Sequence, residues 1–85
     1  MDPWFVYIAK AKTGRFYTGI TPDPQKRILK HNSREGARFA LEQGPMELVY
    51  VSKQFSNKSE ARKREIQIKG WTRDKKEKLI REIWL

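Results

Sequence analysis

Arg27 and His31 are the first residues in this chain that could do chemistry together. They are four positions apart, so a helix would present both side chains on one face. An arginine is permanently charged and offers a fork of N–H donors to a phosphate, whereas a histidine exchanges protons near neutral pH. The pair would suit chemistry on a phosphodiester. The alternative is an exposed arginine beside a solvated histidine, and the spacing alone leaves both readings open.

A third candidate is Glu65, which follows Ala61 by four positions and precedes Ile68 by three. These three residues would share a narrow arc of a helix, and the arc should be buried. A buried carboxylate is costly unless a cation or hydrogen bonds compensate. One explanation is a salt bridge to a neighbouring Lys or Arg. The other is a ligand to Mg²⁺, which accepts one carboxylate and completes its shell with water and phosphate oxygens.

The stretch RFYTGIT reads as a strand that Gly19 interrupts, and the preceding run WFVYIAK carries Tyr7. A glycine leaves no side chain between the sheet and a phosphate, so the backbone could approach closely. Tyr7 and Tyr17 would each place a polar hydroxyl on a rigid arm, although they could equally be ordinary sheet aromatics. A connecting loop of three or five residues would put both tyrosines on one face, and a loop of four would not.

The elements that must position these residues can be predicted from turn and cap signals. Two runs rich in aromatic and β-branched residues, separated by AKTG, predict an antiparallel hairpin. Thr21 is predicted to cap the first helix, Asn57 the second and Thr72 the third, and Gly70 is predicted to end the second helix. The expected strands are Trp4–Lys10, Arg15–Ile20 and a third within Met46–Phe55; the expected helices are Pro22–Asn32, Lys58–Lys69 and Arg73–Ile83.

This order, β-β-α-β-α-α, predicts a single α+β (α/β) domain over residues 1–85, with a three-stranded sheet covered by helices. Residues 37–44 could form an irregular turn or a short helix. Trp71 could stack on a nucleic-acid base, but a place in the core is the stronger expectation.

The charge balance favours a polyanionic partner. The chain has 19 Lys and Arg against 10 Asp and Glu, a formal net charge of +9, and such an excess most often indicates nucleic acid. A generally solubilising surface is the alternative. The chain has no Cys and one His, which excludes disulfides and Cys- or His-rich metal clusters. No apolar run approaches the ~20 residues of a membrane span, and no signal peptide is evident, so we expect a soluble, cytoplasmic protein.

Several short motifs resemble one family when they are taken in order. VYI at residues 6–8, YTG at 17–19, Arg27 with His31, and EARKRE ending at Glu65 resemble the GIY-YIG nuclease superfamily. The fragments YTGIT, ELVY and IKGW extend the similarity to its small single-domain bacterial branch (YhbQ/YazA-like, UPF0213-type). Val6 and Thr18 depart from the name-giving glycine and isoleucine, and a further C-terminal Asn found in some members has no counterpart after Asn57.

The resemblance implies a three-stranded antiparallel sheet flanked by helices and a metal-dependent endonuclease that acts on DNA, in repair or recombination. It implies that Tyr7 activates the attacking water, that His31 receives the proton, and that Tyr17 and Arg27 position the phosphate. It also implies that Glu65 holds one Mg²⁺ or Mn²⁺ ion. The residues expected to contact nucleic acid are Gly19, Arg62, Arg64, Lys69 and Arg73.

Two other functions remain open at this point. The chain could be a nucleic-acid-binding module with weak or lost catalysis, or a module that recruits another protein. RNA is an alternative to DNA as the partner, and a monomer is the working assumption.

Overall fold

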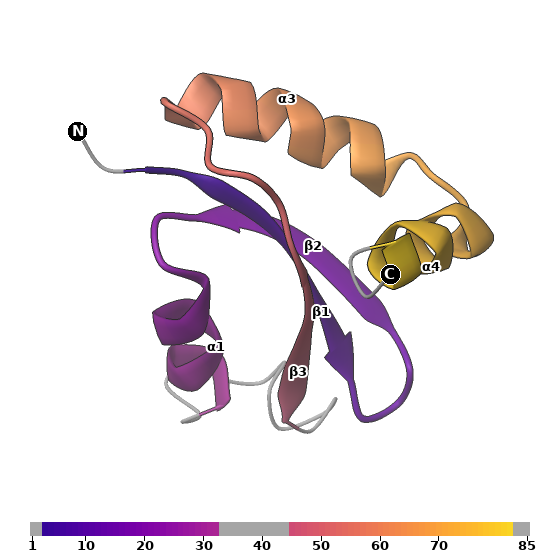
Figure 1. Cartoon of the computed structure of the whole chain (residues 1–85). Coiled ribbons are helices and arrows are strands. Elements are labelled where there is room, and N and C mark those ends of the chain that lie inside the picture. Colours follow the sequence, from indigo (N-terminus) through magenta and orange to yellow (C-terminus); the bar gives the residue numbers. More distant parts are fainter. Residues whose placement is uncertain (1–2, 33–44, 83–85) are drawn as a thin grey trace.

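The computed structural model describes residues 3–32 and 45–82, and it has the predicted α+β architecture (Figure 1). A three-stranded antiparallel sheet in the order β2-β1-β3 carries helices on both faces. The elements are β1 (Phe5–Ala11), β2 (Phe16–Thr21), α1 (Pro24–Asn32), β3 (Met46–Val51), α3 (Lys58–Lys69) and α4 (Arg73–Glu82). The order β-β-α-β-α-α is confirmed. Residues 37–44, where a turn or short helix was expected, lie outside the described residues.

The hairpin between β1 and β2 has the three-residue loop that brings the tyrosines together. The backbone N–H of Ala11 donates to the carbonyl of Arg15, 2.8 Å away, so the loop consists of residues 12–14. Gly14 has φ +96, a left-handed conformation that glycine adopts without a steric penalty. The resulting register pairs Tyr7 with Gly19 and residue 9 with Tyr17. Alternate residues share a face, so both tyrosines lie on the same side of the sheet.

The strand limits differ from the predicted ones for identifiable reasons. β1 and β2 each begin and end one residue later than predicted, because Arg15 closes the turn and Trp4 forms an isolated bridge with Phe55. β3 ends at Val51 instead of reaching Phe55. There the buried Ser52 takes over, since its Oγ accepts from the N–H of Val6 at 2.9 Å and donates to the carbonyl of residue 53. The N–H of Ser52 still donates to the carbonyl of Val6 at 2.8 Å, so the side-chain hydroxyl takes the place of one backbone acceptor of the ladder.

β3 also contains a bulge, which determines what its side chains contact. Ile8 pairs with Tyr50 while the next residue of β1, Ala9, pairs with Leu48, so Val49 is an extra residue. A bulge re-aims the side chains on either side of it. Tyr50 therefore packs under α3, whereas Met46 packs on the opposite face of the sheet.

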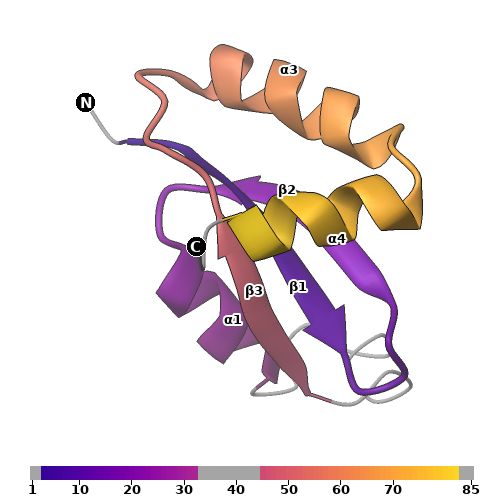
Figure 2. The same ribbon diagram turned by 45° about the vertical axis from the view of Figure 1, so that its right-hand side comes forward.

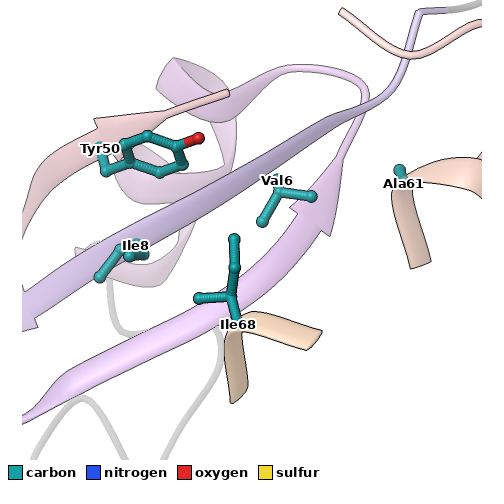
Figure 3. Close-up of a cluster of buried hydrophobic side chains, with 5 residues drawn as sticks. All are labelled: Val6, Ile8, Tyr50, Ala61 and Ile68. Carbon is teal, nitrogen blue, oxygen red and sulfur yellow. The ribbon is translucent and has the colours of Figure 1, made fainter. Parts of the chain in front are cut away.

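The helices divide between the two faces (Figures 1 and 2). On one face, α3 and α4 cover a core of Val6, Ile8, Tyr50, Ala61 and Ile68, which Figure 3 shows converging between sheet and helix. Trp71 packs against this core, as expected. On the other face, α1 covers a smaller cluster of Ala9, Ala11 and Met46, against which Tyr7, Tyr17 and Ile28 pack. Since β1 is the central strand, its alternating side chains supply both cores.

The helix ends confirm most of the predicted caps and correct one. α3 has the predicted limits, and Asn57 Oδ1 accepts from the N–H of Glu60 at 2.9 Å. Thr72 Oγ1 caps α4 by accepting from the N–H of Lys75. Asp23, not Thr21, caps α1 by accepting from the N–H of residue 26, so this helix begins at Pro24 and not at Pro22.

The other helix ends need two qualifications. Thr21 Oγ1 is already used by the N–H of Asp23, which leaves the aspartate carboxylate to cap the helix. Gly70 follows the end of α3 as predicted, but its φ is −80, so it does not use the left-handed conformation available to glycine. The predicted last residue of α4, Ile83, lies outside the described residues. Within residues 3–32 and 45–82, no helix has the length and apolar character needed to cross a bilayer.

Candidate active site

Four of the five predicted catalytic residues line a single pocket on the α1 side of the sheet. The pocket encloses about 280 Å³, and its walls come from β1, β2, α1 and the start of β3. Its lining residues are Tyr7, Tyr17, Thr18, Arg27, Ile28, His31 and Met46. Residues from separate parts of the chain thus meet at one cleft, as expected for a site that binds and positions a small group.

Tyr7 occupies the space that Gly19 leaves. A Cβ placed on residue 19 would lie 2.7 Å from the Tyr7 Oη and 2.8 Å from its Cζ, closer than real side-chain carbons approach. The phenol of Tyr7 therefore extends across the β2 backbone at this glycine. From the sequence, Gly19 was expected to allow the close approach of a phosphate; in the structure, the group that requires the glycine is the Tyr7 ring.

Arg27 and His31 lie one turn apart on α1, as predicted, and they differ in exposure. Arg27 is exposed, whereas His31 is half-buried and its Nε2 is shielded from solvent. This combination leaves the permanent cation at the mouth of the pocket and places the imidazole deeper. The arrangement can neutralise an incoming anion with the guanidinium and accept a proton close to the tyrosines.

Asn32, which the sequence analysis did not assign a role, fixes this end of α1. Its Nδ2 donates to the carbonyl of Met46 at 3.0 Å, and its Oδ1 accepts from the N–H of Met46 at 2.8 Å. These two hydrogen bonds tie the last turn of α1 to the first residue of β3, next to His31. The signal in the sequence was an asparagine at a helix end, a position where its amide readily bonds backbone groups.

Glu65 is buried as predicted, but it does not line the pocket. It is 6% exposed, and Ala61 and Ile68 on the same stripe of α3 are fully buried. One carboxylate oxygen, Oε2, lies 3.5 Å from the Lys69 Nζ. The predicted salt bridge therefore exists, and α3 places Glu65 on the sheet face opposite the tyrosines.

The position of Glu65 along the sheet follows from the contacts at the two ends of α3. Lys58 lies over the Trp4 ring at 5.2 Å, and Arg73, just beyond α3, lies over the Phe16 ring at 4.2 Å. α3 thus runs alongside β2 in the opposite direction, with Glu65 level with the middle of that strand, around Thr18. β2 is an edge strand, so Glu65 and the pocket flank the two faces of the same edge.

The donor set allows one kind of metal site. Within the described part of the chain, no three His, Cys, Asp or Glu side chains gather where they could hold a metal ion. Glu65 can offer one carboxylate only. This fits a hard divalent ion such as Mg²⁺, which keeps several waters and takes further oxygens from a substrate phosphate, and it does not fit an ion that requires a cage of protein ligands.

The residues predicted to contact nucleic acid do not form one cluster in the chain: Gly19 lies on β2, three others on α3 and Arg73 on α4. Arg62 is exposed. Arg64 is half-buried and is held by other residues of the chain: its Nη1 donates to Gln67 Oε1 at 2.7 Å, and its guanidinium lies 5.1 Å from the Trp71 ring. Burial raises the pKa of the Tyr50 phenol above its ordinary value, while the charge of Arg64 and its hydrogen bond to Tyr50 act in the opposite direction. Arg64 is thus partly committed to stabilising the core.

The family model of the GIY-YIG catalytic domain matches residues 3–78. The chain belongs to the GIY-YIG family. It is also similar to the UPF0213 protein of Staphylococcus saprophyticus, with 49% identity over 82 residues that cover 96% of this chain and 99% of that protein. The UPF0213 protein of Staphylococcus epidermidis is 46% identical with the same coverage. A solution NMR structure of the UPF0213 protein from Bacillus halodurans has 41% identity and a TM-score of 0.57, covering 92% of this chain and 82% of that one.

The two departures from the GIY-YIG signature can be placed on the structure. From the sequence, Val6 was placed at the first glycine, but in the order G-I-Y the glycine precedes the tyrosine by two positions, so beside Tyr7 the residue that replaces it is Phe5; Val6 takes the isoleucine position and is fully buried in the core under α3. Thr18 stands at the position of the signature isoleucine, opposite Ile8, and its Oγ1 is buried with no hydrogen-bond partner among the described residues. Both departures leave Tyr7 and Tyr17 in place on one face of the sheet.

Proposed function

We propose that this protein is a metal-dependent endonuclease that hydrolyses phosphodiester bonds in DNA. The observation that carries the proposal is the convergence of Tyr7, Tyr17, Arg27 and His31 on one pocket. Membership of the GIY-YIG family supports a nuclease-type activity, and the net charge of +9 suits a polyanionic substrate.

The pocket residues divide into a binding pair and a proton-transfer pair. Arg27, at the mouth, would hold the non-bridging oxygens of the scissile phosphate and neutralise the charge that grows on them during attack. Tyr17, which lies on the same face of the sheet as Tyr7, would hold the phosphate against the sheet. Both residues come from regular elements, a helix and a strand, which keeps their geometry fixed when the substrate enters.

In the proposed reaction, the oxygen of a water molecule attacks phosphorus and the P–O bond to the leaving nucleoside oxygen breaks. Tyr7 takes a proton from the attacking water while its own hydroxyl proton passes to His31, and solvent protonates the leaving oxygen. The half-buried imidazole of His31 would retain the transferred proton until the product leaves. Gly19 would keep the Tyr7 phenol in position by leaving space for its ring.

Glu65 would hold a single Mg²⁺ or Mn²⁺ ion, which would supply positive charge and Lewis acidity to the phosphate. The chain's own contribution there is the Glu65 carboxylate, which lies 3.5 Å from the Lys69 Nζ. Lys69 would also add positive potential near the edge of β2. One protein carboxylate makes the ion depend on substrate oxygens, so we expect weak metal binding to the free protein and tighter binding in the presence of DNA.

A nicking assay tests the proposal. Supercoiled, linear and branched DNA are incubated with the purified protein in Mg²⁺, in Mn²⁺ and in EDTA, beside the Glu65→Ala variant. The expected result is metal-dependent cleavage by the wild type and none by Glu65→Ala. Preference for branched over linear DNA would support a role in repair or recombination, and a parallel RNA substrate separates DNA from RNA as the target.

A nucleic-acid-binding module without catalysis is the second candidate. The observation that favours it is the position of Glu65, which is paired with Lys69 and absent from the lining of the pocket. This alternative predicts salt-sensitive binding with no cleavage in either metal. Binding and nicking measured on the same preparation distinguish the two functions.

A further inference from the structure

A second concave site adjoins the pocket and is lined by residues at the start of β2 and in the first turns of α4; Figure 2 shows how these two elements are arranged. It encloses about 400 Å³ and is lined by Arg15, Phe16, Tyr17, Arg73 and Lys76. We refer to these five residues as the β2–α4 groove. Tyr17 also lines the catalytic pocket, so the two sites share a wall and a single extended ligand could occupy both.

The groove is strongly positive. Three of its five lining residues are cations, and none is an acid. In the described structure, neither Arg15 nor Lys76 forms an ion pair or a side-chain hydrogen bond, and Arg15 is exposed. Arg73 Nε donates to Glu77 Oε1 at 3.1 Å, a contact that holds the guanidinium in place. The groove is thus suited to an anionic ligand.

The aromatic residue in the groove indicates which part of a nucleic acid would bind there. The Phe16 ring packs against the core under α3, and the Arg73 guanidinium lies 4.2 Å from its centroid. A ring covered in this way is not open as a platform for a base, which needs an exposed aromatic face. The groups that remain are N–H donors of long cationic side chains, and these bind phosphate oxygens without reading sequence.

We propose that the β2–α4 groove binds the phosphodiester backbone of the nucleic-acid strand next to the phosphate in the catalytic pocket, irrespective of base sequence. The inference deepens the proposed function and rests on it in one respect: the position of the bound strand is defined relative to a scissile phosphate in the catalytic pocket. Arg15 and Lys76 are the new contact residues, and Arg73 acts with them. Arg15 and Tyr17 are two residues apart on one chain, so the strand would run along β2 from the pocket toward the hairpin and α4.

Equilibrium binding provides the first test. The probes are fluorescently labelled single strands, one of oligothymidylate and one of mixed sequence, measured in EDTA over a range of salt concentrations. The groove variant is Arg15→Gln/Lys76→Gln. Its matched control, Lys53→Gln/Lys58→Gln, removes the same charge at the opposite end of β1, where these lysines lie over Phe55 and Trp4.

The two double variants should behave differently. Losing two phosphate contacts to a single strand should make the slope of log affinity against log salt shallower by roughly 1.4, and should lower affinity on the order of tenfold near ~0.1 M salt. Both probes should be affected equally. The control should keep most of the wild-type slope. Equal losses of affinity in the two double variants, or a loss of affinity for only one of the two probes, would overturn the proposal that the groove binds the backbone.

Cleavage of a small substrate separates this inference from the proposed function. The p-nitrophenyl ester of thymidine 5′-phosphate contains a single phosphodiester, so it has no neighbouring phosphate that could bind in the groove. The groove variant should cleave DNA more slowly at low DNA concentration and should cleave this ester at the wild-type rate, and an equal loss on both substrates would overturn the groove. If the wild type cleaves neither substrate, the proposed nuclease activity is refuted. The proposal for the groove is then decided by the binding measurement alone.

Discussion

The phenol of Tyr7 lies across the backbone of Gly19, the residue that it pairs with on the neighbouring strand. The contact is so close that residue 19 has no room for a Cβ, which would fall 2.7 Å from the Tyr7 Oη. The glycine and the first tyrosine of the GIY-YIG signature are therefore one structural unit. The Tyr7 ring can take this position only because residue 19 has no side chain.

Gly19→Ala should displace the Tyr7 ring and lower cleavage sharply while the protein stays folded. Overpacking of this kind costs typically 1–3 kcal/mol of unfolding free energy. Gly70→Ala is the matched control, because a Cβ there meets nothing closer than 3.6 Å. In a Tyr7→Ala background the Gly19→Ala penalty should largely vanish, as measured by denaturant titration of the wild type, the Tyr7→Ala and Gly19→Ala variants and the double variant. A penalty that is the same in both backgrounds would contradict the contact.

Arg27→Ala should slow cleavage far more than it weakens binding. Removing one donor that stabilises developing charge typically costs on the order of 10²–10³ in rate, whereas binding rests on many distributed cations. Lys26→Ala, one residue away on the exposed side of α1 and not in the pocket lining, is the control and should leave the rate nearly unchanged. Single-turnover rates and DNA affinities are measured together. If both quantities fell by the same factor, Arg27 would be a surface contact only.

Glu65→Gln should abolish metal-dependent cleavage and leave the fold intact. Leaving one member of a buried pair unpaired can cost roughly 3–5 kcal/mol, but the Lys69 side chain is 55% exposed and water can solvate its charge. We therefore expect a loss of about 1 kcal/mol, as for a partly exposed pair. Lys69→Gln removes the same ion pair and keeps the carboxylate, so it should retain metal-dependent activity. A folded and fully active Glu65→Gln would remove the proposed metal site.

Tyr50 should make stability fall at high pH. Its folded pKa is raised above 10.0, mainly by burial, so the folded state keeps its proton after the unfolded chain has begun to lose it. The stabilisation from this shift is complete below the unfolded pKa and is lost as pH rises through the folded pKa. The stability advantage of the wild type over Tyr50→Phe should shrink above about pH 10. Chemical denaturation at several pH values checks this, and an advantage that widens with pH would show that the shift has the opposite sign.

The fold was predictable where local signals agreed. The limits of α3 follow from Asn57 as its cap, Gly70 after its end, and one buried stripe between them. The start of α1 was predicted wrongly because Thr21 and Asp23 are both good capping residues, and only the structure shows that Thr21 is used by Asp23. The bulge at Val49 depends on pairing between strands far apart in sequence, which no local pattern encodes.

The candidate site shows the same division. The spacing of Arg27 and His31 predicted their shared face, and the helical arc of Glu65 predicted its burial. The sequence could not place Glu65 across the sheet from the pocket. The helical arc predicts which side of α3 is buried, but it does not predict which face of the sheet the helix packs against. Arg15, Asn32 and Lys76 were missed because each acts through a neighbour distant in the chain.

The two hydrogen bonds between the Asn32 side chain and the backbone of Met46 bear on which changes of chain length the pocket can tolerate. They join residues 14 positions apart through one side chain and one peptide unit. The ends of α1 and β3 are therefore held to each other directly, and the stretch between them need not be a particular length to keep His31 beside Met46. Lengthening a segment whose two ends are already held together costs little free energy, because the closure term grows only with the logarithm of the segment's length. Insertions between Asn32 and Met46 should therefore leave the relative positions of the pocket residues on α1 and β3 unchanged.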